Sequence, residues 1–211
     1  LHSDTHSFPT RRSSDLETIR SFGVTEIRVF ATSAIRSASN GTDFVDAVRQ
    51  RFGLRVRVIP GDREAELIYK GVRQAIRLTG EKVLILDIGG GSNEFILCNG
   101  EGIIWKRSFE IGMARILELF SLSDPITPEE ISAVESYYWE ELQPLLEVAK
   151  KEKPVSLIGA SGSFDTFYSL IVHAKGEGPD HRNGRVIPMK DFKMIHRVLL
   201  RSTLEERKTM P

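Results

Sequence analysis

The chain has 211 residues, of which 40% are hydrophobic and 27% are charged, and its 29 basic side chains balance its 29 acidic ones. This composition is ordinary for a globular protein of one large or two small domains, and a net charge of zero predicts no general attraction to a nucleic-acid polymer or an anionic membrane. A single cysteine, Cys98, excludes an internal disulfide framework and a cysteine-based zinc cluster, and favours a reducing, cytoplasmic location.

The first 16 residues, LHSDTHSFPTRRSSDL, follow neither a helical nor a strand period and lack the apolar core of a signal peptide. We interpret residues 1–16 as a disordered segment foreign to the domain, similar to translated sequencing-adapter DNA joined to a broken reading frame. We expect it to make no specific contact with the rest of the chain.

The first elements alternate between strands and helices. Glu26–Ala31 is rich in β-branched and aromatic residues and predicts a buried strand. Thr32–Ser39 predicts a short helix, and Thr42 is a candidate cap for the next one. Leu54–Ile59 alternates arginine with apolar residues, which is typical of a half-buried strand.

A longer helix and three strands follow. The helix is predicted to end at Gly80, and its buried face consists of Ala65, Ile68, Val72, Ala75 and Ile76. Lys82–Ile88, Glu94–Cys98 and Gly102–Phe109 predict strands, and Asn99-Gly100 predicts a two-residue hairpin turn between the last two. This arrangement differs from a Rossmann unit, in which a helix follows the glycine loop.

The last third is mostly helical. Ile111–Phe120 predicts a helix, and Thr127 caps another whose Pro128 and Glu130 complete a capping box. Pro144 should kink or divide that helix. The remaining predicted elements are a strand at Val155–Ile158, a glycine/serine loop at Gly159–Ser163, and helices at Phe164–Val172 and Lys190–Leu200.

The best chemical signal is the run that follows the strand KVLILDI. Asp87 stands at the carboxyl end of this strand, and three glycines come directly after Ile88. Glycines let a backbone approach a ligand closely, and successive N–H groups can form a concave nest for a phosphate. Asp87 could hold Mg²⁺, because hard cations prefer oxygen ligands. The predicted phosphate-binding residues are Gly89, Gly90, Gly91, Ser92 and Asn93.

Three other segments are ambiguous when taken alone. The acidic residues of PGDREAE, starting at Pro60, are explained by the dipole of a helix that begins there. ATSAIR, ending at Arg36, is explained by a strand-to-helix turn. The small-residue loop after the late strand is an equivocal anion-site signal; it consists of Gly159, Ala160, Ser161, Gly162 and Ser163.

Together the segments resemble a known family. ATSAIRSASNGTDFVDAV, VIPGDREAELIYKGV, LILDIGGGSNEFIL, SFEIGMARILELF and LIGASGSFDTF, in this order, are similar to the exopolyphosphatase/guanosine pentaphosphate phosphohydrolase (Ppx/GppA) family. The resemblance runs from about Ile27 to the end. It implies an α/β protein of the actin-like ATPase fold, with residues 17–81 as the C-terminal part of a first domain and residues 82–211 as an incomplete second domain.

The resemblance also implies roles for single residues. Glu64 would orient or deprotonate the attacking water, and Arg36 would neutralise phosphate near the bond that is cleaved. Asp87 would be the carboxylate associated with Mg²⁺. Gly89–Asn93 would bind phosphate, and Gly159–Ser163 would line the cleft where actin-like relatives bind a nucleoside. The implied partner is polyphosphate or a guanosine polyphosphate nucleotide, and a homodimer of the full-length protein stays open.

The chain departs from the family in one major respect. No Asp-x-Gly-Ser loop precedes the first predicted strand, and relatives continue beyond Pro211. We therefore expect weak or no activity for this polypeptide. Three alternatives to an exopolyphosphatase stay open, namely a guanosine pentaphosphate phosphohydrolase, a nucleotide-binding regulator without hydrolysis, and an actin-like kinase. Glu64 favours an enzyme over a regulator, because a pure phosphate-binding site needs no carboxylate to activate water.

Overall fold

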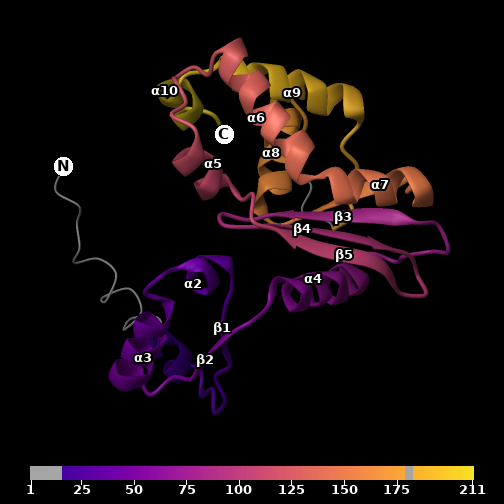
Figure 1. The fold of residues 1–211 in the computed structure, drawn as a ribbon. Coiled ribbons are helices and arrows are strands. Elements are labelled where there is room, and N and C mark those ends of the chain that lie inside the picture. Colours follow the sequence, from indigo (N-terminus) through magenta and orange to yellow (C-terminus); the bar gives the residue numbers. More distant parts are fainter. Residues whose placement is uncertain (1–15, 179–182) are drawn as a thin grey trace.

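The computed structural model describes residues 16–178 and 183–211, so nearly all of the predicted foreign segment lies outside the described residues. Figure 1 shows a smaller part around strands β1 and β2 and a larger part around a second sheet, with α4 connecting them. None of the described helices has the length and apolar character that a membrane crossing requires.

The smaller part is a two-stranded parallel sheet whose strands are connected by two helices. Gly41 permits the tight turn between these helices, because a Cβ at this position would stand 2.2 Å from the carbonyl oxygen of Ile35. The second helix ends at Gly53, whose positive φ of 68° is the left-handed conformation that glycine adopts without penalty. The elements are β1 (Val29–Ala31), α2 (Ser33–Ser37), α3 (Gly41–Phe52) and β2 (Val56–Val58).

The larger part contains a four-stranded sheet in the order β5-β4-β3-β6. The first three of these strands in the chain form an antiparallel meander, and β6 pairs parallel to β3 with Asp87 opposite Ala160. The carboxyl ends of β3 and β6 therefore lie next to each other at the same end of the sheet. The strands are β3 (Val83–Ile88), β4 (Asn93–Cys98), β5 (Ile103–Phe109) and β6 (Ser156–Ala160).

Helices cover both faces of this sheet (Figure 1). Phe95 and Ile96 are neighbours in β4 and point to opposite faces, as the pleat requires. Ile96 packs with Ala65 and Tyr69 of α4, whereas Phe95 packs with Leu145 of α7. The helices are α4 (Gly61–Ala75), α5 (Met113–Leu119), α6 (Pro128–Glu141), α7 (Gln143–Glu152), α8 (Gly162–Lys175), α9 (Met189–Arg201) and α10 (Leu204–Lys208).

Two local predictions in the helical region are confirmed. The Thr127 side chain accepts a hydrogen bond from the Glu130 N–H, and the Glu130 side chain accepts one from the Thr127 N–H, so the capping box is complete. α6 ends at Glu141 and α7 begins at Gln143, which is the division that Pro144 predicted.

The hairpin predicted at Asn99-Gly100 is confirmed, because β4 and β5 pair antiparallel, but its predicted two-residue turn is wrong. A type I′ turn needs positive φ at both central residues, and neither residue has one. Instead the loop extends to Gly102, and the Asn99 side chain accepts hydrogen bonds from the N–H groups of Glu101 and Gly102. Gly100 serves a close approach, because its N–H donates to the Thr79 carbonyl and a Cβ would stand 2.9 Å from that oxygen.

Other boundaries differ by a few residues. α4 ends at Ala75 rather than Gly80, since Ile76 already has an extended backbone. Thr42 lies inside α3, which Asn40 precedes without a side-chain cap. The predicted loop at Gly159–Ser163 is shorter than expected: its first two residues end β6, its last two begin α8, and Ser161 alone connects them.

Candidate functional site

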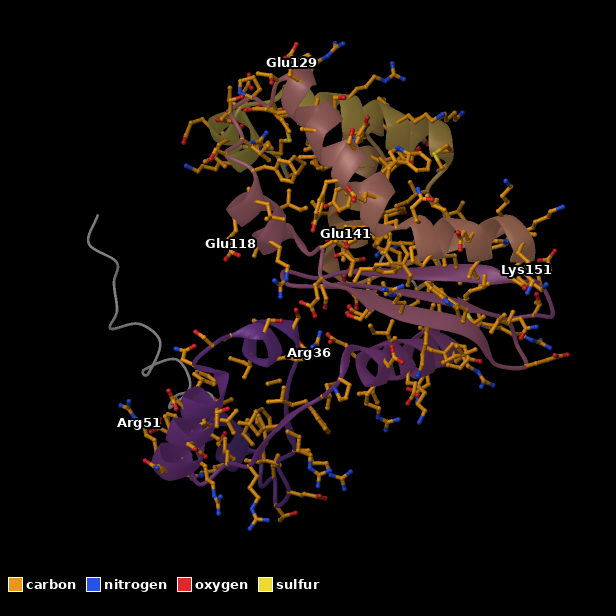
Figure 2. The ribbon with its side chains drawn as sticks, in the orientation of Figure 1. Arg36, Arg51, Glu118, Glu129, Glu141 and Lys151 are labelled. Carbon is orange, nitrogen blue, oxygen red and sulfur yellow. The ribbon has the colours of Figure 1, made fainter. Side chains whose placement is uncertain are left out.

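Arg36 and Glu64, predicted as catalytic, form an ion pair. Arg36 lies in α2 and Glu64 in the first turn of α4, and their Nη1 and Oε2 atoms are 3.4 Å apart. The Arg36 Nη1 also donates to the carbonyl of Ile59 at 3.0 Å, which ties the guanidinium to the chain just before α4. Arg36 lies on the side of α2 that faces the four-stranded sheet (Figure 2).

A second carboxylate, that of Glu110, meets the same arginine from the end of β5. Arg36 donates to its Oε1 at 3.0 Å, and Arg115 of α5 donates to its Oε2 at 2.5 Å. The hydroxyls of Ser33 and Ser37 donate to the same Oε2 at 2.9 and 3.1 Å. We call these four donors, Ser33, Arg36, Ser37 and Arg115, the oxyanion cradle.

The oxyanion cradle perturbs the acidity of Glu110. Partial burial disfavours the charged form of this carboxyl, but the hydrogen bonds from the four donors outweigh it and hold the pKa of Glu110 below its usual value. Glu110 is therefore a carboxylate at neutral pH, held between two guanidinium groups.

The glycine run is the hairpin between β3 and β4. The Gly89 N–H donates to the Ser92 carbonyl at 3.0 Å and to the Asn93 Oδ1 at 3.2 Å. In the part of the chain that the structure describes, the N–H groups of Gly90 and Gly91 have no protein acceptor. These two backbone donors are the ones available to a phosphate, whereas the predicted roles of Gly89, Ser92 and Asn93 as phosphate donors stay predictions.

The side chains of Ser92 and Asn93 hold the hairpin in place. Ser92 donates to Glu94 at 2.7 Å, and Asn93 donates to the Ile111 carbonyl at 3.4 Å. The three glycine carbonyls accept from the first N–H groups of the α5 region, at Gly112, Met113 and Ala114. The hairpin is thus anchored on the start of α5.

Close packing brings the hairpin against α2. A Cβ on Gly91 would stand 2.6 Å from the Ser33 hydroxyl and 2.9 Å from its Cβ. The Arg115 Nε donates to the Gly91 carbonyl at 3.0 Å, so one arginine contacts both the hairpin and Glu110. The structure therefore brings Glu64, Arg36 and the glycine hairpin together on one side of the molecule.

Three carboxylates, those of Glu64, Asp87 and Glu94, lie near the face of the sheet that α4 covers. Asp87 and Glu94 are directly opposite each other on β3 and β4, and Glu94 is 2% exposed. The Glu94 carboxylate accepts hydrogen bonds from the hydroxyls of Ser92 and Ser108 and makes no ion pair within the described residues. It is a buried charge held by neutral donors.

Burial and mutual repulsion change the acidity of two of these carboxyls. Burial raises the pKa of Glu64 above its usual value, and the negative charges of Glu94 and Asp87 add to this increase against the opposing effect of Arg36. Burial likewise raises the pKa of Glu94, with a further contribution from Asp87. Carboxyl groups with pKa values shifted in this way are typical of functional sites.

No cluster of three or more metal-ligating side chains occurs among residues 16–178 and 183–211.

The second glycine segment, Gly159–Ser163, lies beside the first, Gly89–Asn93, where strands β6 and β3 end. Ser161 has φ 71° and ψ 174°, a conformation that is otherwise almost restricted to glycine, and its hydroxyl lies 3.5 Å from the Ile88 carbonyl oxygen. The missing Cβ of Gly159 allows the Phe164 ring to pack directly on the strand. Gly159–Ser163 and Gly89–Asn93 thus lie side by side, as the parallel pairing of β3 and β6 requires.

A pocket of about 310 Å³ opens beside the Arg36 and Glu110 side chains. Arg36 and Glu110 form part of its wall, and the start of α4 forms another part. Its remaining lining residues are Pro60, Gly61, Asp62 and Ser108. The pocket is small, and its charged wall suits a water molecule or another polar group rather than an apolar ligand.

Sequence analysis missed Glu94 and Glu110. An available signal for Glu94 was a charged residue directly before the apolar run FILC of β4. No local pattern singles out Glu110, because its four partners come from α2 and α5.

Comparison with known proteins identifies the family. A model of the Ppx/GppA phosphatase family matches residues 16–211. The chain belongs to the Ppx/GppA phosphatase family. Among the relatives of this Ppx/GppA chain, the bifunctional 3-dehydroquinate synthase/phosphatase of Fusobacterium nucleatum is 37% identical over 145 residues, which are 67% of the chain and 22% of that protein.

Solved structures agree with this family. An exopolyphosphatase from Cytophaga hutchinsonii superposes with a TM-score of 0.90 at 34% identity, over 95% of this chain and 66% of the other. The Ppx-GppA enzyme of Aquifex aeolicus has a TM-score of 0.70 at 29% identity, over 91% of this chain and 62% of the other. The Ppx/GppA chain therefore has the actin-like ATPase fold, which confirms the predicted fold class, and it spans less than two thirds of the length of each of these relatives.

Proposed function

We propose that this site hydrolyses the terminal phosphoanhydride bond of inorganic polyphosphate, with Glu64 as the base. The observation that carries the proposal is the pairing of Glu64 with Arg36 beside the glycine hairpin. A base, a fixed cation and bare backbone N–H groups are the parts that phosphoryl transfer needs, because the reaction depends on positioning and charge neutralisation.

The proposed reaction assigns one step to each group. Glu64 takes a proton from water while the water oxygen bonds to the terminal phosphorus. The bond from phosphorus to the bridging oxygen breaks, and its electron pair stays on the shortened polyphosphate. The raised pKa of Glu64 supports its role, since a stronger base accepts the proton more readily. Arg36 and the N–H groups of Gly90 and Gly91 neutralise the charge that develops on the phosphoryl oxygens.

Mg²⁺ fits the carboxylates of this site. Glu94 is buried without an ion pair and is repelled by Asp87, so a bound divalent cation would relieve an unfavourable charge. Asp87 would hold the ion, with Glu94 beside it, because magnesium is commonly bound by one or two carboxylates together with substrate phosphates. When bound, it would supply charge neutralisation at the phosphates.

The test replaces Glu64 in the full-length product of the gene. We expect Glu64→Gln to lower phosphate release from polyphosphate by roughly 10²–10⁴-fold without changing the melting temperature by much. Glu118→Gln is the matched control, because Glu118 is an exposed residue of α5 that makes no ion pair within residues 16–178 and 183–211. Near-parental turnover by the Glu64 variant would disprove the assignment.

Guanosine pentaphosphate is the second candidate substrate. The contact between Ser161 and the end of β3 places a second glycine segment next to the proposed phosphate site, where it could contact a nucleoside attached to the phosphates. Phosphate release measured on both substrates with the same protein distinguishes the two. A preference of tenfold or more for guanosine pentaphosphate, roughly one step of 1.4 kcal/mol, would replace polyphosphate as the assigned substrate.

A further inference from the structure

The oxyanion cradle is filled by a residue of the protein itself. Glu110 receives two guanidinium and two hydroxyl donors, and each of its oxygens is used. Guanidinium groups and hydroxyls arranged in this way bind carboxylates and phosphates alike, because both present paired oxyanions. The chemistry of the oxyanion cradle is therefore that of a phosphate site with a carboxylate in it.

Both terminal nitrogens of the Arg36 guanidinium already have acceptors within the protein. Its Nη1 contacts Glu64 and the Ile59 carbonyl, and its Nη2 contacts Glu110. Glu110 and Asp62 line the pocket together with Arg36, so a polyanion in the pocket meets two negative charges beside the arginine. For a phosphoryl group to take the place of this carboxylate in the oxyanion cradle, Glu110 must give up its hydrogen bonds.

The Glu110 side chain is partly open to solvent and lies in the connection between β5 and α5. Glu110 follows the last residue of β5 and precedes α5, and 44% of its side chain is exposed. Arg115 stays fixed when Glu110 leaves, because its Nε donates to the Gly91 carbonyl of the hairpin. The serines are likewise fixed, since both belong to α2, which packs against the hairpin at Gly91.

We infer that Glu110 is an internal substitute for phosphate, which occupies the oxyanion cradle in the free protein and is displaced when a phosphoryl group binds. This inference rests on the proposed function, and it adds a specificity-determining residue to that site. Glu110 lowers the affinity of the site for a single phosphate and favours ligands with enough charge to compete, as a chain of phosphates has. The low pKa of Glu110 keeps the substitute charged at neutral pH.

The experiment measures binding of inorganic phosphate to the full-length protein by isothermal titration calorimetry. Inorganic phosphate is used because it cannot be hydrolysed further. We expect Glu110→Gln to lower the Kd for phosphate by roughly tenfold or more, since the variant removes a charge that competes for two guanidinium groups. Glu110→Asp keeps the charge on a shorter side chain and should give a smaller decrease in Kd.

Glu118→Gln is the matched control for net charge. Glu118 is an exposed residue of α5 that lies away from Arg36 (Figure 2), and it makes no ion pair within the described part of the chain. Its variant should bind phosphate with the parental Kd. Circular dichroism and the melting temperature check that each variant folds.

Each outcome decides the inference. The inference is supported if both Glu110 variants bind phosphate more tightly than the parent and the Glu118 variant does not. Equal binding by the parent and both Glu110 variants overturns it, and leaves the proposed hydrolysis to be judged by the Glu64 assay. No phosphate binding by the parent or by any folded variant also overturns it, because an emptied oxyanion cradle should accept the anion.

Discussion

Glu94 illustrates how a single side chain can be costly to folding and useful to function. Its carboxylate is almost completely buried, and its charge is stabilised by hydrogen bonds from the hydroxyls of Ser92 and Ser108 and, less strongly, by the charge of Arg36. Because burial and Asp87 raise the pKa of Glu94, the folded chain binds more protons than the unfolded chain just above pH 4.5. The free energy of unfolding therefore decreases as the pH rises through that window, and the deficit persists at neutral pH.

Replacing this charge should stabilise the metal-free protein. We expect Glu94→Gln to raise the melting temperature at pH 7 in the presence of a chelator by about 2–4 °C, the change that 1 kcal/mol produces in a chain of this size. At about pH 4 and below the gain should disappear, because both side chains are then neutral. Glu118→Gln serves again as the exposed control and should change the melting temperature little at either pH. A lower melting temperature for Glu94→Gln at pH 7 would contradict this account.

At the scale of elements, a local sequence signal predicts where a helix begins or ends only when the groups that hydrogen-bond or pack there are near each other in the chain. The capping box of Thr127 and Glu130 spans three residues, so its geometry follows from the helix itself. Gly41 and Gly100, in contrast, lie where a side chain has no room. The Ile35 carbonyl approaches Gly41 closely, and the Thr79 carbonyl approaches Gly100. A sequence pattern cannot distinguish such a glycine from one that adopts a positive φ.

The capping box offers a test at this scale. We expect Thr127→Ala to lower the free energy of unfolding by about 1 kcal/mol, because the Glu130 N–H at the start of α6 loses its acceptor. Ser136→Ala is the comparison, since Ser136 lies within α6 and its hydroxyl only donates to the Ser132 carbonyl. That variant should be neutral or slightly stabilising, as alanine is the better helix former. Equal losses in the two variants, measured by urea denaturation, would argue against a specific cap.

At the scale of the whole molecule, α4 decides how the smaller part meets the sheet. Its start contacts β5 so closely that a Cβ on Gly61 would stand 2.3 Å from the Cβ of Ser108. Farther along, Lys106 of β5 contacts both the Asp62 carbonyl and the Glu66 carboxylate. Because Glu64 lies between these contacts in α4, its position beside Arg36 depends on this packing.

The Gly61 contact can be tested by a double-mutant cycle. We expect Gly61→Ala to destabilise the protein by about 1–3 kcal/mol through overpacking, and Ser108→Gly to relieve part of that loss when the two are combined. Gly71→Ala is the matched control in the same helix, because a Cβ there meets nothing within 4 Å. It should stabilise the helix by roughly 0.5–1 kcal/mol. Strictly additive losses for Gly61→Ala and Ser108→Gly would show that the two residues do not limit the approach of α4.

The sequence by itself determined the features that depend on short stretches of chain. These are the order of strands and helices from β1 to α9, the capping box at Thr127, the division at Pro144, and the ordered motifs that resemble the Ppx/GppA family. The short helix α10 was not predicted. Only the tertiary structure decided which charges meet, including the two carboxylates on Arg36 and the burial of Glu94. The physical reason is that the two contacts on Arg36 join residues 28 and 74 positions apart, so they exist only after α2, α4 and the sheet have packed together.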